Sequence, residues 1–86
     1  MGFKYGTKDL EEASFLWTHP FVKYEGCERR GVKQVFFNFS SEKEDMRAMV
    51  DDYHAKRATV EPKTFAQRQK DILDILHKTL RRDDQQ

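Results

Sequence analysis

Hydrophobic and polar residues alternate along residues 21–39 in two runs, which are separated by charged residues and one glycine. Because successive side chains of a strand point to opposite faces, each run predicts a β-strand with one apolar face. Gly31 suits a turn position with positive φ, so we place the turn of a β-hairpin at Arg29–Gly31. The predicted core face of the hairpin consists of Val22, Tyr24, Val35, Phe37 and Phe39.

Three other segments have apolar residues at three- and four-residue spacing, which predicts amphipathic helices. The first has Thr7 as its predicted N-cap and ends before Pro20, because the residue before a proline disfavours the α conformation. The second begins at a capping box of Ser41 and Glu44, and the third has Pro62 at its first position. The helix residues that we expect to meet Phe37 in one core cluster are Trp17, Met49, Tyr53, Phe65, Ile72 and Leu76.

A two-stranded ribbon is not stable alone in water, so other elements must cover one of its faces. We therefore predict an α+β fold with the order α-β-β-α-α, in which three helices pack on one face of an antiparallel β-hairpin. Residues 1–80 are expected to form a single domain. Residues 81–86 are expected to form a polar C-terminal tail that frays.

Three phenylalanines do not fit this core. Phe36 points to the outer face of the hairpin, Phe15 lies nearly opposite the apolar stripe of its helix, and Phe3 precedes that helix. Because a small domain seldom exposes several large apolar side chains without a partner, Phe3, Phe15 and Phe36 are candidate interface residues. In the alternative, the segment Phe3-Lys4-Tyr5 folds back as a third strand and covers Phe15 or Phe36 within one chain.

The charged residues are numerous but balanced, since they make up 36% of the chain and leave a net charge of +1. A strongly basic chain would indicate a nucleic acid or an anionic membrane, and this balance does not. The hairpin is locally basic, however, with Arg29 and Arg30 at its tip and Lys23 and Lys33 on its strands. A two-stranded ribbon fits the major groove and arginines reach phosphates and base edges, so these four residues are candidates for nucleic-acid binding.

No spacing in the chain indicates a catalytic or metal site. The single cysteine, Cys27, lies between Glu25 and Glu28, whose negative charges disfavour a reactive thiolate. The histidines lack the paired spacing of zinc ligands. A row formed by Asp71, Asp74 and His77 on the third helix is explained by local pairing on a solvated face. We expect no enzymatic activity, no cofactor and no metal.

The chain also lacks the sequence signals of export. An odd cysteine fits a reducing compartment, and no hydrophobic run approaches the roughly 20 residues of a membrane span. The N-terminal residues MGFKYG lack the apolar core of a signal peptide. We therefore expect a cytoplasmic protein.

Three short motifs lie in a recognisable order: Thr7-Lys8-Asp9-Leu10, then Phe37-Asn38-Phe39, then Val60-Glu61-Pro62 followed by Phe65. In this order the chain resembles a family of small uncharacterised domains from bacterial and phage proteins over roughly residues 5–80. It departs from that pattern at Trp17-Thr18-His19-Pro20, where a turn containing glycine is more usual. The resemblance implies a fold and an association with phage-borne or mobile genes, and it carries no activity.

These observations favour a small non-catalytic binding or assembly module. The expected partner is another protein or a second copy of the chain, because the unplaced phenylalanines provide apolar anchors for an interface. The alternative is a nucleic-acid-binding module that uses the basic hairpin tip. Whether another copy buries the outer face of the hairpin or leaves it open distinguishes the two hypotheses.

Overall fold

A three-stranded antiparallel sheet carries the fold, and β3 (Gln34–Ser41) is its central strand. The structure is a computed structural model and describes residues 2–32 and 34–84. On either side of β3 lie β1 (Phe3–Thr7) and β2 (Val22–Arg30). The predicted hairpin is therefore present as β2 and β3, and β1 adds the third strand that the alternative proposed.

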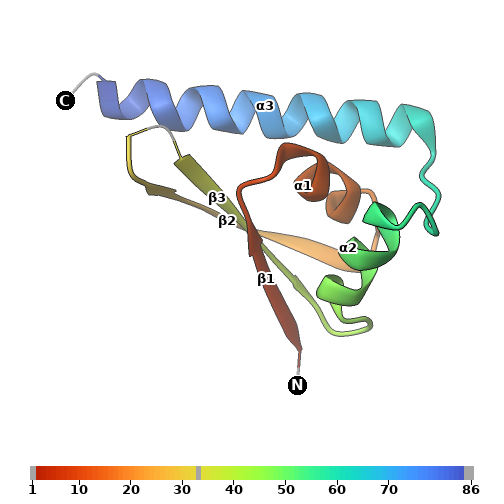
Figure 1. The fold of residues 1–86 in the computed structure, drawn as a ribbon. Helices are drawn as coiled ribbons and strands as arrows, with labels where there is room; N and C mark the ends of the chain where they lie inside the picture. Colours follow the sequence, from red (N-terminus) through yellow and green to blue (C-terminus); the bar gives the residue numbers. More distant parts are fainter. Residues whose placement is uncertain (1, 33, 85–86) are drawn as a thin grey trace.

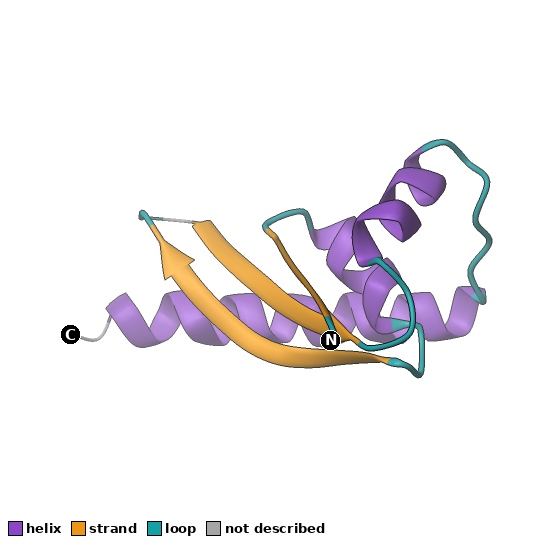
Figure 2. Cartoon of the chain, turned by 90° about the horizontal axis from the view of Figure 1, so that it is seen from below, coloured by secondary structure: helices purple, strands orange, loops and turns teal. Residues whose placement is uncertain are grey.

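The helices α1 (Leu10–Trp17), α2 (Met46–His54) and α3 (Pro62–Asp84) all lie on one side of the sheet. In Figure 1, α3 extends across α1 and reaches over the far end of the hairpin. Figure 2 shows the molecule from below, where the strands lie in front of α3 and α2 lies to one side of them. The prediction of an α+β fold with three helices on one face is confirmed, and the observed order is β-α-β-β-α-α.

The predicted assignment of the hairpin faces is confirmed. Val35, Phe37 and Phe39 are each 3% exposed or less, and they alternate with more accessible residues along β3. The turn follows Arg30, where Gly31 has a φ of +78°. A β-bulge between Tyr24 and Gly26 interrupts β2, and the φ of +117° at Gly26 is a conformation that glycine adopts without strain.

The predicted core cluster is also confirmed. Phe37, Met49 and Ile72 are buried at its centre. Partly buried side chains from the helices pack against them, among them Trp17, Tyr53, Phe65 and Leu76. The apolar stripes of the helices and the inward residues of the hairpin thus belong to one core.

The prediction for Phe15 was wrong. Its side chain is 1% exposed, its ring stacks on Tyr53 of α2 at 4.5 Å between centroids, and it meets the edge of the His19 ring at 4.9 Å. The physical reason is that α1 lies between the sheet, α2 and α3, so the helix buries more than one face. Four consecutive α1 residues are therefore buried, and a single apolar stripe does not describe them.

Two predicted helix caps are displaced along the chain. Asp9, not Thr7, caps α1, and its carboxylate accepts from the backbone N–H groups of the first turn. Asp45, not Ser41, caps α2. Both predicted caps end strands instead, and their hydroxyls accept hydrogen bonds from the loops that follow. Pro62 begins α3 as predicted.

Helix α3 continues to Asp84, so residues 81–84 are helical rather than part of a frayed tail. Lys70, Asp71 and Asp74 interrupt any apolar run along α3. Among the described residues, no helix combines the length and the apolar character needed to cross a membrane.

Candidate functional site

The face of the sheet that the helices leave uncovered is the candidate functional site, and we call it the open face. Its position follows from the strand alternation, because residues between the buried positions of β2 and β3 point away from the helices. The register aligns these residues in rows across the strands. From one end of the open face to the other, the β3 members of the rows are Ser40, Asn38, Phe36 and Gln34.

The first row is basic on both sides. Lys4 of β1 and Lys23 of β2 both lie opposite Ser40, and both lysines are exposed. The bulged residue Glu25 brings a carboxylate to the same end of the open face, where it accepts a hydrogen bond from the Ser40 hydroxyl. Positive and negative groups therefore lie next to each other at this end, and neither sign prevails.

The second row has no side chain on either flank of Asn38, because its strand partners are Gly6 and Gly26. A Cβ atom at Gly6 would lie 2.8 Å from Asn38 Oδ1, so the absent side chain leaves the space that the Asn38 amide occupies. The centre of the open face is consequently low, and another surface could approach the backbone there.

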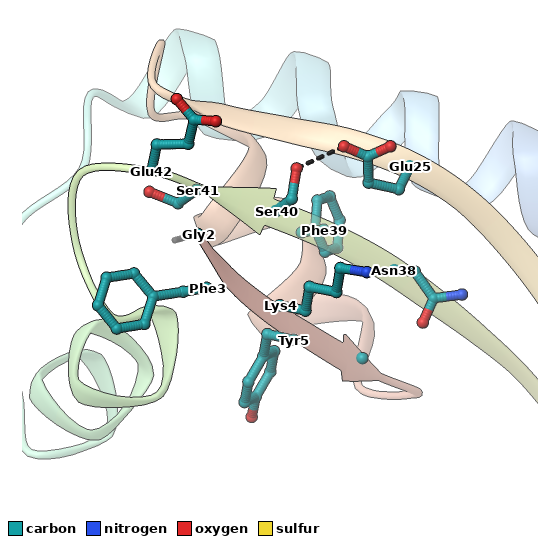
Figure 3. Close-up of a pocket in the computed structure, with 11 residues that line it drawn as sticks. Gly2, Phe3, Lys4, Tyr5, Glu25, Asn38, Phe39, Ser40, Ser41 and Glu42 are labelled. Atoms are coloured by element: carbon teal, nitrogen blue, oxygen red, sulfur yellow. Dashed lines mark hydrogen bonds between the residues drawn. The ribbon is translucent and has the colours of Figure 1, made fainter.

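Two open grooves hollow the Ser40 end of the open face. One has a volume of about 660 Å³ and follows β1 and β3 from Gly2 to Asn38, as Figure 3 shows. The other has a volume of about 440 Å³ and lies toward Phe21 and Lys43. They share the lining residues Glu25, Ser40, Ser41 and Glu42, so together they form one depression across all three strands.

The opposite end of the open face is raised by a half-buried phenylalanine with an arginine above it. The guanidinium of Arg30 lies 4.5 Å from the centroid of the Phe36 ring, within the range of a cation–π contact. Glu28, which lies directly opposite Phe36, forms an ion pair with Arg30. The three side chains form one surface unit that is apolar beneath and charged above.

Three of the four predicted nucleic-acid-binding residues lie within the described residues, and these three do not share one place on the sheet. Lys23 lies seven residues from Arg30, which at the rise of a strand separates them by about 20 Å. Arg29 points to the helix side of the sheet and donates to the carbonyls of Gly31 and Val32. The fourth candidate, Lys33, lies outside the described residues.

The three predicted interface residues lie in three different places. Phe36 lies on the open face, as expected. Phe15 is in the core and cannot contribute to an interface. Phe3 is 40% exposed but belongs to the helix side of β1, since it lies opposite the buried Ser41. Neither Phe3 nor Tyr5 covers Phe36, because β1 extends the sheet at its edge.

No metal-binding cluster stands out among the side chains that the structure describes. Within residues 2–32 and 34–81, no three His, Cys, Asp or Glu side chains gather closely enough to hold a metal ion. Asp71 is engaged by Gln67 and Arg68. Cys27 is half-buried, and its sulfur lies 3.4 Å from the Thr79 hydroxyl, which connects β2 to the C-terminal half of α3.

The structure does reveal a polar cluster that the sequence did not indicate. The Glu12 carboxylate accepts from the Tyr5 and Thr7 hydroxyls, each at 3.0 Å, and its other oxygen lies 2.7 Å from His54 Nε2. Burial and the bond to Glu12 raise the pKa of Tyr5 to about 12. The hydrogen bond to Glu12 also raises the pKa of His54. The cluster ties β1, α1 and α2 together, and it depends on the third strand, which the sequence predicted only as an alternative.

Comparisons of the chain with models of protein families, with curated proteins and with solved structures find no match. The resemblance to small bacterial and phage domains therefore stays a prediction. Any function has to be argued from the open face itself.

Proposed function

We propose that this protein is a non-catalytic assembly module that associates with a second copy of itself through the open face. The observation that carries the proposal is the uncovered sheet, on which Phe36 is retained although no helix packs against it. A symmetric dimer presents the same patch on both copies, and aromatic side chains are frequent anchors of such patches. With Phe15 in the core, the proposed interface is restricted to the sheet.

The charges of the open face favour a protein partner over a nucleic acid. Its lysines and arginine alternate with Glu25, Glu28 and Glu42, whereas a nucleic-acid site presents an excess of positive charge. The Arg30 guanidinium, moreover, is already paired with Glu28. Binding at the hairpin tip stays an alternative, and salt-dependent retention of the protein on DNA or RNA would support it.

The test of the proposal is sedimentation of the parent and of Phe36→Lys. The parent should sediment as a dimer at micromolar concentration. Phe36→Lys should give a folded monomer, because the change removes the apolar anchor and places like charges near the symmetry axis. Circular dichroism should show that the variant keeps its secondary structure. A parent that stays monomeric at millimolar concentration contradicts the proposal.

A matched control separates the open face from another exposed apolar residue. Val32 is 77% exposed at the hairpin turn. Val32→Lys makes the same kind of change outside the open face, so this variant should remain dimeric. Dissociation of the control to the extent seen for Phe36→Lys would place the interface elsewhere.

A further inference from the structure

We infer that two copies pack open face to open face around a two-fold axis that crosses the strands at the row of Gly6, Asn38 and Gly26. This inference rests on the proposed self-association and adds its geometry. The row is suited to the axis because its flanking glycines leave the centre of the open face low. Two sheets that pack face to face lie about 10 Å apart, and side chains of both sheets fill the space between them. The row on the axis meets its own copy, so the absence of side chains at Gly6 and Gly26 leaves room there for the two Asn38 side chains.

The two ends of the open face lie at equal distances from this axis. Phe36 precedes the axis row and Ser40 follows it, each two residues from Asn38 along β3 and therefore about 7 Å away. A two-fold rotation about the axis exchanges the ends but keeps each strand on its own side. Ser40 of one copy then faces Phe36 of the other, and Lys23 faces Glu28 of the other.

The shapes of the exchanged ends are complementary. The Ser40 end is hollowed by the two grooves, which share Glu42 at their border. The Phe36 end is raised by the phenylalanine ring and by Arg30 above it. The rotation places the raised end of each copy over the hollow of the other, and it brings Arg30 toward the carboxylate of Glu42. A two-fold interface makes both of these contacts twice.

Shape favours this axis over a two-fold axis along β3. Rotation about β3 would place the two raised Phe36 ends over each other and the two hollowed ends over each other. That rotation would also place Lys4 over Lys23 of the second copy, since both lie in the same row, and like charges at such a contact are unfavourable. The axis across the strands instead pairs Lys23 with Glu28, although it brings Lys4 near Lys8, which follows the end of β1.

A charge-reversal experiment tests this geometry. Lys23→Glu and Glu28→Lys should each raise the dissociation constant of the dimer at least tenfold, because each places two like charges in both symmetric contacts. An equimolar mixture of the two variants should form a heterodimer with an affinity near that of the parent. In that mixture one copy carries Glu at both positions and the other carries Lys at both, so both contacts are attractive again.

The outcomes separate this inference from the proposed function. A monomeric parent overturns the self-association and the inference with it. A dimeric parent whose two variants remain dimeric, or dissociate but do not combine when mixed, overturns only the axis proposed above. Lys63→Glu and Glu44→Lys are the matched control pair, since both residues are exposed and lie outside the open face. Each control should dimerise like the parent, and mixing them should change nothing.

Glu28→Lys also removes the ion pair with Arg30, so its fold must be checked by thermal melting. The neutral variants Lys23→Gln and Glu28→Gln provide a second measurement if a reversal variant does not fold. Each should weaken the dimer and reduce the dependence of its affinity on salt, since one attractive contact per half-interface is lost. Neutral variants with the affinity and salt dependence of the parent dimer would contradict the proposed pairing.

Discussion

Phe36 and Phe37 are neighbours on β3, yet one belongs to the open face and the other to the covered face of the same sheet. Phe37 is 0% exposed in the core cluster, whereas Phe36 is half-buried under a guanidinium group that the solvent also reaches. The two positions share residue type, strand and backbone conformation. Their difference arises from the helical layer alone.

The two faces of the sheet differ in how strongly packing constrains their residues. On the covered face each large side chain fills space between the sheet and a helix, so its size and shape are fixed by packing. On the open face the fold requires little of Phe36, Glu28 or Lys23. The proposed interface would use their combination into a raised, charged unit.

The largest expected difference between the two faces comes from truncating each phenylalanine in turn. Phe37→Ala should lower the free energy of unfolding by about 3–5 kcal/mol, the usual range for a core aromatic. Phe36→Ala should lower it by about 1 kcal/mol or less in the monomer, because its ring is only half-buried. Urea unfolding at low protein concentration measures both values. Equal losses for the two variants would show that both faces of the sheet contribute equally to the stability of the monomer.

Substitution of Glu12 tests whether the helices also hold β1 at the edge of the sheet. Glu12→Ala removes the acceptor for Tyr5, Thr7 and His54 and should lower the free energy of unfolding by about 2–3 kcal/mol. Glu11→Ala is the matched control, since it changes an exposed carboxylate one position away. Hydrogen exchange should also quicken in β1 of the Glu12 variant. Unfolding free energies equal to those of the control would show that β1 is held by its backbone pairing with β3.

The covered face could be predicted from the sequence, whereas the edge strand was predicted only as an alternative. Alternation in β3 identified Val35, Phe37 and Phe39 as inward residues, because strand residues point to one of only two faces. The strand β1 is short and contains Gly6, so its pattern did not decide between a third strand and an unpaired segment. Because the register of β1 with β3 was not predicted, the partners of Thr7 and Glu12 could not be anticipated.

Single residues of the candidate site could be predicted from the sequence, but the arrangement of the site could not. The outward position of Phe36 followed from alternation alone, and this prediction is confirmed. The error at Phe15 arose because a helix enclosed on several sides has no single apolar stripe. The row of Gly6, Asn38 and Gly26 depends on the bulge at Glu25 and on the pairing of β1, and both are properties of the sheet rather than of any one segment.

The two glycines of the open face differ in the reason why a side chain would be unfavourable. Gly26 has open space around it but a φ of +117°, so Gly26→Ala should cost about 1–2 kcal/mol through backbone strain. At Gly6 a Cβ atom would displace only the Asn38 amide. Gly6→Ala should therefore cost less, about 1 kcal/mol, and an Asn38→Ala background should relieve part of it. A cost at Gly6 that persists in that background would indicate a backbone clash.

The smallest expected effect is a dependence of stability on pH at the edge where α2 meets β1. The hydrogen bond to Glu12, together with the charges of Glu12, Asp9 and Glu11, raises the pKa of His54 in the folded protein. A raised folded pKa means that protonated His54 stabilises the fold. This contribution is complete below the ordinary histidine pKa of about 6.5 and is lost as the pH rises through the folded value. The difference in unfolding free energy between the parent and His54→Ala should therefore be larger at pH 6 than at pH 9, as measured by urea unfolding. A difference at His54 that does not vary between these pH values would mean that the neutral hydrogen bond alone joins α2 to Glu12.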